Sequence, residues 1–363
     1  MNHLLVNLQL LSERLINNMI VQQKIKLSLF FLALFLLLNS QSSIYAQSGI
    51  NPTKIIRVGQ SGWQFLKING DPRQAALGGS VMTTINPTAN VVFGSPAMLT
   101  LVEDKNIQFN TLNWIADIKY YSMVYSHRIN RIGTFAISAV VLDYGDIPET
   151  IHMQSPGGGT YHFITGNTFT ASDLAIGLSY ARKITSQLSI GGTLRYLNET
   201  IASTGMSNWS ADFSTIYFTG FRSLRLSLTA RNFGPDAHLV GYSEELQSEP
   251  VDIRMPLELR AGVAYDILEK DDDPHLLTLI VEGKVSSDGP EKIHLGTEYS
   301  FNNLFSLRAG YRVNYDEEGI TLGSGVNFPI GRQQYSVSYA FLDFGALKQV
   351  HMFSIGWTIS REK

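Results

Sequence analysis

The segment QYSVSYAFLDFG (Gln334–Gly345) alternates between two kinds of side chain at successive positions. Large apolar residues point one way and small residues the other, with Tyr335, Val337, Tyr339 and Phe341 set against Ser336, Ser338 and Ala340. A period of two residues is typical of a β-strand that has one apolar face and one polar face. The segment therefore predicts a strand that separates two different environments.

The same alternation runs through the chain from residue 106 onward. We count about fourteen segments of roughly ten to twelve residues, which begin near residues 106, 119, 132, 172, 188, 207, 223, 254, 275, 291, 304, 319, 333 and 348. Strands of soluble proteins average about five to six residues, whereas a tilted strand needs about 9–11 residues to cross a bilayer. No long amphipathic helix is predicted between the segments, which favours an all-β protein over a parallel α/β sheet.

The connections between these segments differ in length. Tight turns are predicted near Asn130–Arg131 and Asn302–Asn303, whereas Tyr144–Ala171 and Gly234–Ile253 are expected to be long loops. Short turns at one end and longer loops at the other are typical of a bacterial outer-membrane barrel, whose closure pairs every backbone group that faces hydrocarbon. The sequence therefore predicts a transmembrane antiparallel β-barrel of about 14 strands over residues 105–359, in the cell outer membrane. A soluble β-sandwich is the alternative.

The pattern also predicts which residues near the ends of the strands face lipid. Aromatic residues such as Tyr120, Tyr121 and Trp357 are expected to form interfacial girdles that face lipid. The alternation through RMPLELRAGVAYDI (254–267) places Met255 on the same lipid-facing side as Leu259.

The N-terminus carries the features of an export signal. Lys24 and Lys26 precede the apolar run LSLFFLALFLLL, and the polar stretch after it offers a cleavage site following Ala46. The apolar run of about twelve residues is shorter than the roughly 20 that a transmembrane helix needs. We expect residues 1–46 to be a signal peptide, with Met19 as a candidate true start and an uncleaved anchor as the alternative.

The composition excludes several kinds of site. The chain contains no cysteine, so disulfides, thiolate ligands and cysteine nucleophiles are excluded. Its formal net charge of −3 gives no general attraction for nucleic acid. The eight histidines are scattered without an H-E-x-x-H motif, and the glycine-rich stretch SPGGGTYHF lacks the Gly-Lys ending of a phosphate-binding loop. We therefore expect no enzyme activity, no metal, no cofactor and no nucleic-acid partner.

The segment before the first predicted strand, GWQFLKINGDPRQAALGGSVMTTINPTANVVFGSPAMLT (62–100), has a distinctive order of motifs. An aromatic–leucine start is followed by an Arg-x-Ala-Ala-x-Gly-Gly element and then by a Ser-Pro-Ala-x-Leu box. This order resembles the N-terminal region of the PorV/PorQ family of outer-membrane barrels, which are related in architecture to the FadL transporters. Ser95 stands where the family pattern has asparagine, and Gln74 interrupts the alanine run. The motif residues are Phe65, Leu66, Arg73, Gly78, Gly79, Ser95, Pro96, Ala97 and Leu99.

The resemblance implies that residues 47–104 fold into short helices and turns inside the barrel. The chemistry of the segment suits that place, because Gly78 and Gly79 allow the backbone to approach the wall and several prolines interrupt regular structure. A barrel of about fourteen strands leaves a bore that its own side chains do not fill. We expect a lumen plug, in which Asp71 and Arg73 pair with lumen charges, with a periplasmic linker as the alternative. Residues 360–363 are expected to be a C-terminal tail.

Charged residues fall on the polar phase of several predicted strands. Both signs occur, which predicts either a salt-bridge lattice that holds the plug or a lined channel. The lumen-charge candidates are Arg195, Arg225, Arg231, Glu258, Arg260, Glu282, Lys284, Glu298, Arg308 and Arg312.

Two functions stay open from the sequence. The family resemblance implies a non-enzymatic component of a type IX-like protein secretion and cell-surface attachment system. Such a component contacts outer-membrane lipid and docks exported cargo proteins or other secretion-system subunits through its extracellular loops. The alternative is a FadL-like transporter of hydrophobic compounds across the outer membrane. A transporter needs an apolar pocket and a lateral exit, whereas a docking barrel needs an exposed binding face.

Overall fold

The structure is a computed structural model, and it describes residues 61–82, 87–102, 105–154, 158–202, 204–237, 253–268, 274–331 and 333–359. These residues belong to one compact unit, Ile56–Lys363, whereas the other unit, Met1–Ile55, lies outside the described residues. The predicted signal peptide and the predicted tail 360–363 therefore also lie outside them.

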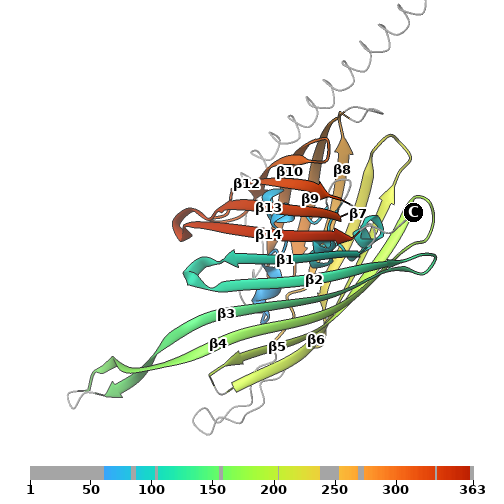
Figure 1. The fold of residues 1–363 in the computed structure, drawn as a ribbon. Coiled ribbons are helices and arrows are strands. Elements are labelled where there is room, and N and C mark those ends of the chain that lie inside the picture. The colour runs from blue at the N-terminus through green and yellow to red at the C-terminus, as the bar shows by residue number, and fades with distance from the viewer. Residues whose placement is uncertain are drawn as a thin grey trace, which may run out of the picture. The chain divides into compact units, whose positions relative to one another are not determined.

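The described residues form a closed antiparallel β-barrel of fourteen strands, in which β1 pairs with β14 (Figure 1). The predicted fold class is thus confirmed. The strands are β1 (Lys105–Asn113), β2 (Lys119–Ile129), β3 (Gly133–Gln154), β4 (Thr160–Lys183), β5 (Leu188–Ile201), β6 (Thr204–Phe218), β7 (Arg225–Phe233), β8 (Glu258–Asp266), β9 (His275–Ser286), β10 (Gly289–Phe301), β11 (Phe305–Val313), β12 (Ile320–Ile330), β13 (Gln333–Asp343) and β14 (Gln349–Ile359).

The two ends of the barrel differ. At one end β1 begins and β14 ends, and we call it the terminal end. At the opposite end, which we call the hairpin end, β7 ends and β8 begins. The hairpin of β3 and β4 projects from this end (Figure 1). Bacterial barrels have short periplasmic turns and longer extracellular loops, so the hairpin end corresponds to the cell exterior.

The prediction of a long loop over Tyr144–Ala171 is wrong. Strands β3 and β4 are 22 and 24 residues long and stay paired beyond the barrel wall. Their register shifts between Asp143 and Asp146 and again between Pro148 and Thr150, so the turn-forming residues of this stretch lie at β-bulges. The predicted loop is therefore mostly a twisted two-stranded extension.

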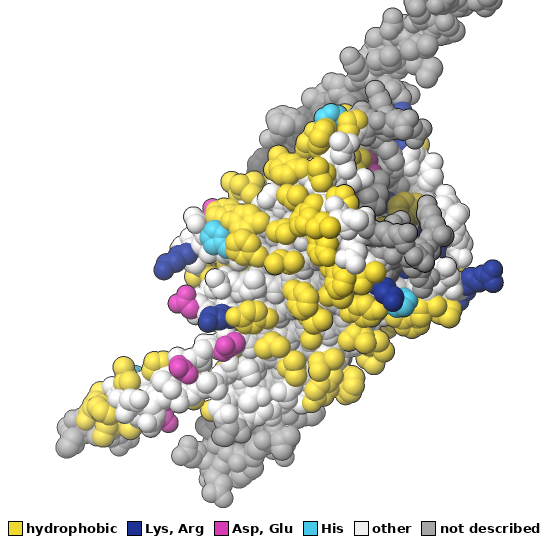
Figure 2. Space-filling view, in the orientation of Figure 1, with side chains coloured by type: hydrophobic (Ala, Val, Ile, Leu, Met, Phe, Trp, Pro, Cys, Tyr) yellow, Lys and Arg dark blue, Asp and Glu magenta, His cyan; other side chains and the backbone are white. Residues whose placement is uncertain are grey.

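The wall alternates as the sequence predicts. On β7, Leu226 and Leu228 point outward and are 40% and 57% exposed, whereas Ser227 and Thr229 are buried inside. Hydrophobic side chains are spread over the face seen in Figure 2, with charged side chains mainly near its edges. Two expectations are wrong: Tyr120 is buried inside the barrel, and Met255 precedes β8 and is buried in the interior beside Asn208.

The interior is occupied by the segment Ser61–Val102, whose described residues we call the plug. It contains the short helices η2 (Gln64–Lys67), α2 (Pro72–Ala76), η3 (Ala89–Phe93) and η4 (Pro96–Leu101). Two other short helices, η5 (Ile115–Asp117) and η6 (Gly345–Leu347), lie in wall connections. Apolar plug residues form one buried core with inward-facing wall residues such as Leu112 and Leu142. None of the helices among the described residues is long and apolar enough to cross a membrane.

The plug runs from the hairpin end to the terminal end. Gly62 donates a backbone hydrogen bond to the carbonyl of Arg254, just before β8 at the hairpin end (3.0 Å). At the other extreme, the Thr100 hydroxyl contacts the Ser189 hydroxyl near the start of β5 (2.9 Å). The chain therefore passes through the bore before it enters β1.

Candidate functional site

The plug touches the wall most closely at its glycine pair. Gly78 and Gly79 have φ angles of +71° and +83°, a region that glycine adopts readily and other L-residues rarely do. A Cβ on Gly78 would lie 2.7 Å from the carbonyl oxygen of Leu295, in the wall strand β10. The Gly78 amide also donates to the Thr321 hydroxyl (3.0 Å). The two glycines thus let the plug lie directly against the wall.

Arg73 fixes helix α2 to the wall. Its guanidinium donates to Glu298 Oε2 at 2.9 Å, and Glu298 Oε1 accepts from Arg308 Nε at 2.8 Å. One buried carboxylate is therefore shared by a plug arginine and a wall arginine. Asp71 has a different role from the one predicted, because its carboxylate accepts from the Arg73 amide and caps α2.

Arg260 is the centre of a second cluster. It donates to Glu258 (2.9 Å) and to Glu282 (3.2 Å), and it also donates to the carbonyl of Gly79 (3.0 Å). Glu258 accepts in addition from Lys284 Nζ at 2.7 Å. Glu282 accepts from the Val81 amide of the plug (3.0 Å). This cluster joins two wall strands, β8 and β9, to the plug.

Three further wall arginines complete the lattice. Arg195 lies 2.6 Å from Asp212 and donates to the plug carbonyl of Val92 (3.3 Å). Arg231 lies 3.6 Å from the same Asp212, and it donates to the plug carbonyl of Leu66. The third, Arg225, makes a two-pronged ion pair with Asp266 on β8.

All ten lumen-charge candidates are buried, at inward-facing positions of six wall strands, β5 and β7 to β11. Nine of them join the contacts just described, and Arg312 pairs with Glu318 nearer the hairpin end. The sequence reading missed Asp212, Asp266 and His294, although all three fall on the same polar phase of their strands. Their position among the inward-facing residues of the alternating pattern is the signal by which the sequence could have identified them.

The remaining motif residues also lie in the interior. Phe65, Leu66 and Leu99 are buried in the apolar core. In the Ser-Pro-Ala-x-Leu box, the Ala97 amide donates to the Ser214 hydroxyl of β6 (2.7 Å). Ser95 caps no helix end with its side chain, and Pro96 takes the first turn of η4. The box therefore positions the terminal-end part of the plug against β4, β5 and β6.

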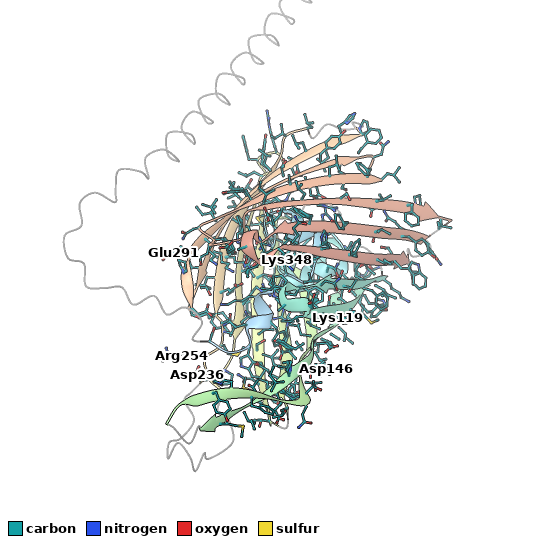
Figure 3. The ribbon with its side chains drawn as sticks, turned by 90° about the vertical axis from the view of Figure 1, so that its left-hand side faces the viewer. Lys119, Asp146, Asp236, Arg254, Glu291 and Lys348 are labelled. Carbon is teal, nitrogen blue, oxygen red and sulfur yellow. The ribbon has the colours of Figure 1, made fainter. Side chains whose placement is uncertain are left out.

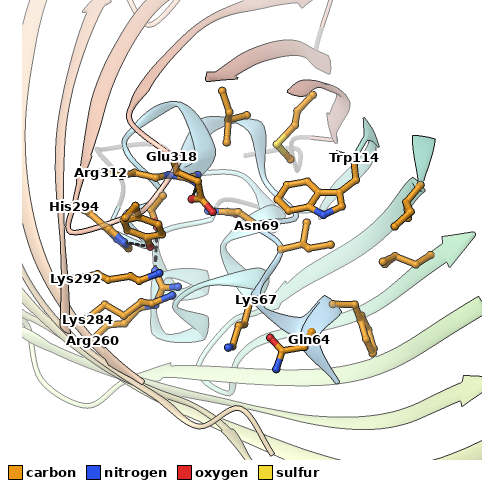
Figure 4. Close-up of a pocket in the computed structure, with 18 of the residues that line it drawn as sticks. Gln64, Lys67, Asn69, Trp114, Arg260, Lys284, Lys292, His294, Arg312 and Glu318 are labelled. Atoms are coloured by element: carbon orange, nitrogen blue, oxygen red, sulfur yellow. Dashed lines mark hydrogen bonds and ion pairs between the residues drawn. The ribbon is translucent and has the colours of Figure 1, made fainter. Parts of the chain in front are cut away.

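A cavity of about 320 Å³ lies at the hairpin end, between the plug and the wall. Figure 4 shows Arg260, Lys284, Lys292 and Arg312 on one side of it and Trp114 on the opposite side. Its apolar lining comes from the plug and from β3, β13, β14 and the β1–β2 connection, through Phe65, Ile68, Trp114, Ile118, Leu142, Leu342 and Met352. The cavity is therefore amphipathic, with a cationic wall facing an apolar wall.

Most cations of this wall are neutralised within the described residues. Arg260 and Lys284 share Glu258, and Arg312 pairs with Glu318. Lys292 differs, because no ion pair is recorded for it in this part of the chain, and its Nζ lies 3.7 Å from the centroid of the Tyr315 ring. Burial raises the pKa of Tyr315 to about 12, so its neutral hydroxyl stays beside His294 Nε2 at 2.8 Å.

The plug is fastened at the rim of this cavity by Asp288, in the β9–β10 turn. Its carboxylate accepts from Lys67 Nζ (2.5 Å), from Gln64 and from the Ser61 hydroxyl. Burial alone raises the pKa of Asp288, but hydrogen bonds from these groups and from Ser286 hold it well below its ordinary value. Asp288 is thus an ionised anchor for the start of the plug.

No group of three or more metal-ligating side chains gathers anywhere in the described part of the chain. Neither a protein-family model nor a curated protein matches this chain.

The barrel is similar to solved outer-membrane transporters. The toluene transporter TodX of Pseudomonas putida is 12% identical, over 78% of this chain and 96% of that chain, with a TM-score of 0.52. The Ralstonia pickettii toluene transporter TbuX is also 12% identical, over 80% and 97% of the two chains, with a TM-score of 0.49. A Pseudomonas aeruginosa FadL homologue is 10% identical, over 80% and 97%, with a TM-score of 0.46.

The likeness to TodX shows the fold, and at this identity it shows no substrate. This chain is an outer-membrane β-barrel that shares its fold with TodX, which confirms the predicted location. The three neighbours named above are not PorV or PorQ proteins, so the resemblance to that family stays a prediction.

Proposed function

We propose that this barrel takes small hydrophobic or amphipathic molecules across the outer membrane, with the cavity at the hairpin end as their first binding site. The observation that carries the proposal is the amphipathic lining of that cavity. Ligand sites are concave and mostly apolar, with a few polar groups that fix orientation. The fold shared with TodX, a toluene transporter, supports the same reading.

Lys292 favours an amphiphile with an anionic head among such molecules. Its ammonium lies on the cavity wall without a recorded carboxylate partner in the described residues, opposite the apolar side chains. A carboxylate placed beside Lys292 would leave an apolar body against Trp114 and Met352. Burial of that body supplies affinity in proportion to the apolar area removed from water.

The plug restricts the routes by which a bound molecule could leave the cavity toward the periplasm. Below the cavity its core residues pack against the wall. The Arg73–Glu298 ion pair and the hydrogen bond from Arg260 to the Gly79 carbonyl also join the plug to the wall. Passage therefore requires a displacement of the plug or an exit through the wall. Pairing between β6 and β7 stops at Ala211, so residues 204–210 of β6 lack a β7 partner.

Binding of radiolabelled laurate and of toluene to the mature protein in lipid nanodiscs tests the proposal. We expect Ile118→Trp, which fills the cavity, to abolish binding of both probes. The matched control Ile132→Trp changes an exposed turn at the terminal end and should bind as the wild type does. Lys292→Gln should weaken laurate binding and leave toluene binding unchanged. Wild-type binding by Ile118→Trp would refute the proposal.

A second candidate function, docking of exported proteins or secretion-system subunits, is favoured by the projecting β3–β4 hairpin. Two successive cross-strand pairs, Ile151 with Phe163 and Met153 with Tyr161, share one face of the hairpin. All four side chains are more than 40% exposed beyond the barrel wall. Exposed apolar clusters of this kind mark interaction surfaces.

Comparison of proteins in the culture medium and on the cell surface tests this second function. If the barrel docks secreted cargo, replacing Ile151 and Phe163 by serine should change the set of surface-attached proteins. The matched control is Ile190→Ser with Phe213→Ser, on lipid-facing positions of the wall. An unchanged set after the hairpin substitutions would exclude docking through this face.

A further inference from the structure

A recess of about 350 Å³ lies on the outer surface of the barrel, where β14, β1, β2 and β3 are neighbours. Its centre is Thr111, a small side chain between two aromatic rings. The strand register places Thr111 directly opposite Phe353 on β14 and directly opposite Tyr121 on β2. Phe109, Met123 and Ile355 form the next row toward the terminal end. The recess is thus a shallow hollow lined mainly by apolar side chains.

The position of the recess decides what fills it. Its walls are outward-facing side chains of a membrane-spanning barrel, and Phe109, Phe353 and Ile355 are 54%, 50% and 62% exposed. In a membrane these side chains face hydrocarbon rather than water. Apolar atoms that line an unfilled gap lose dispersion contacts, and a flexible hydrocarbon chain that enters the gap restores them. The occupant is therefore an acyl chain of a membrane lipid.

A polar row lies immediately above the recess, toward the hairpin end. Asn113 pairs with His351 on β14 and with Lys119 on β2, and Lys119 pairs in turn with Asp143 on β3. This polar row bounds the apolar recess on the side of the hairpin end. The recess therefore opens at the level of lipid headgroups in the outer leaflet.

Two lysines supply positive charge at that level. Lys119 begins β2 on the same outward face as Tyr121, and Lys348 lies in the β13–β14 connection beside His351. Both are exposed, and Figure 3 places them near each other on the rim of the hairpin end. Within the described residues no ion pair is recorded for either lysine, whereas Asp143 accepts a hydrogen bond from the Gly145 amide. Charge at the rim is therefore available to an anionic headgroup.

We propose that this surface is a specific site for lipid A, the phosphorylated glycolipid of the outer leaflet. One acyl chain lies in the recess over Thr111, and the phosphates lie against Lys119 and Lys348. A two-part match of this kind, apolar groove below and cations above, distinguishes lipid A from a zwitterionic phospholipid. The site lies outside the barrel and does not depend on the function proposed for the lumen.

Native mass spectrometry of the mature protein, with added diphosphoryl lipid A or phosphatidylcholine, tests the proposal. We expect the wild type to retain lipid A in preference to phosphatidylcholine. Thr111→Trp fills the recess and should lower lipid A affinity about tenfold. Thr215→Trp makes the same change on the outward face of β6, far around the wall, and should have no effect. Heat-modifiable gel mobility confirms that each variant is a folded barrel.

The headgroup contact is tested separately. Each lysine near an anionic lipid contributes about 1 kcal/mol, so Lys119→Gln with Lys348→Gln should lower lipid A affinity about 25-fold. The control Lys183→Gln removes an exposed charge at the terminal end and should leave it unchanged. Monophosphoryl lipid A should bind more weakly than the diphosphoryl form to the wild type only. Wild-type affinity in Thr111→Trp, or equal retention of phosphatidylcholine, would overturn the proposal.

Discussion

The contact between Gly78 and the wall gives the sharpest test of how the plug is held. Gly78→Ala adds one methyl group at a φ of +71°, 2.7 Å from the Leu295 carbonyl oxygen and 3.0 Å from that of Tyr311. Both neighbours are backbone atoms of paired wall strands, so neither can turn aside. The plug must therefore move away from β10 and β11.

Gly145→Ala is the matched control, because Gly145 has a φ of +68° and no heavy atom within 4 Å of its added Cβ. A left-handed conformation costs a non-glycine residue roughly 1–2 kcal/mol, and both variants lose that amount. Overpacking typically costs another 1–3 kcal/mol, which only Gly78→Ala loses. We expect losses of about 2–5 kcal/mol for Gly78→Ala and about 1–2 kcal/mol for Gly145→Ala.

Urea unfolding in lipid vesicles, followed by the fluorescence of the four tryptophans, measures these losses. Planar bilayers provide a second readout, because a plug displaced from the wall should raise single-channel conductance in Gly78→Ala alone. Equal stability losses and equal conductance in the two variants would show that close packing at Gly78 does not hold the plug.

Four other outcomes are expected. Glu298→Gln leaves both neighbouring arginines without their shared carboxylate and should cost about 3–5 kcal/mol of unfolding free energy in urea. Leu228→Arg should cost about 2–4 kcal/mol near the bilayer midplane, well beyond Leu228→Ala, and equal losses would mean that this face does not meet lipid. The lowered pKa of Asp288 means that its stabilisation is complete above about pH 3.9, the ordinary value, and is lost as the pH falls below it. The urea midpoint should therefore drop less in Asp288→Asn than in the wild type between pH 6 and pH 3. Deleting residues 360–363 should leave heat-modifiable barrel intact, because Ile359 already pairs with both neighbouring strands, and loss of the barrel would place an assembly signal in the tail.

The strand pattern could be predicted because lipid and a packed interior impose opposite demands on alternate residues. Each of the fourteen strands was anticipated, and β2, β5, β9 and β13 begin at the predicted residues. The stretch after Tyr144 contains Gly145, Pro148 and Gly166, residue types that are common in turns, so its sequence does not identify it as strand. In the structure Gly145 and Gly166 have positive φ angles within the strands of the hairpin.

The inward phase of the charged residues could also be predicted, but their partners could not. Whether Arg225 meets Asp266 depends on the register in which β7 pairs with β8. The periodicity of side chains within one strand carries no information on that register. The cavity could not be predicted from the sequence for the same reason. Its lining joins the plug residue Phe65 to Lys292 and Met352, which lie far apart in the sequence and meet only after closure.

The route of the plug sets the order in which this molecule can be built. Ser61 lies at the hairpin end and Val102 at the terminal end, so the chain already crosses the bore when β1 starts. A finished ring could admit this segment only by threading its free N-terminus through a packed interior. The sheet must instead curl around the plug, and the junction of β1 with β14 is its final seam. Such a wrapped assembly never presents an empty hole to the cell, so the permeability barrier is preserved while each new copy is inserted.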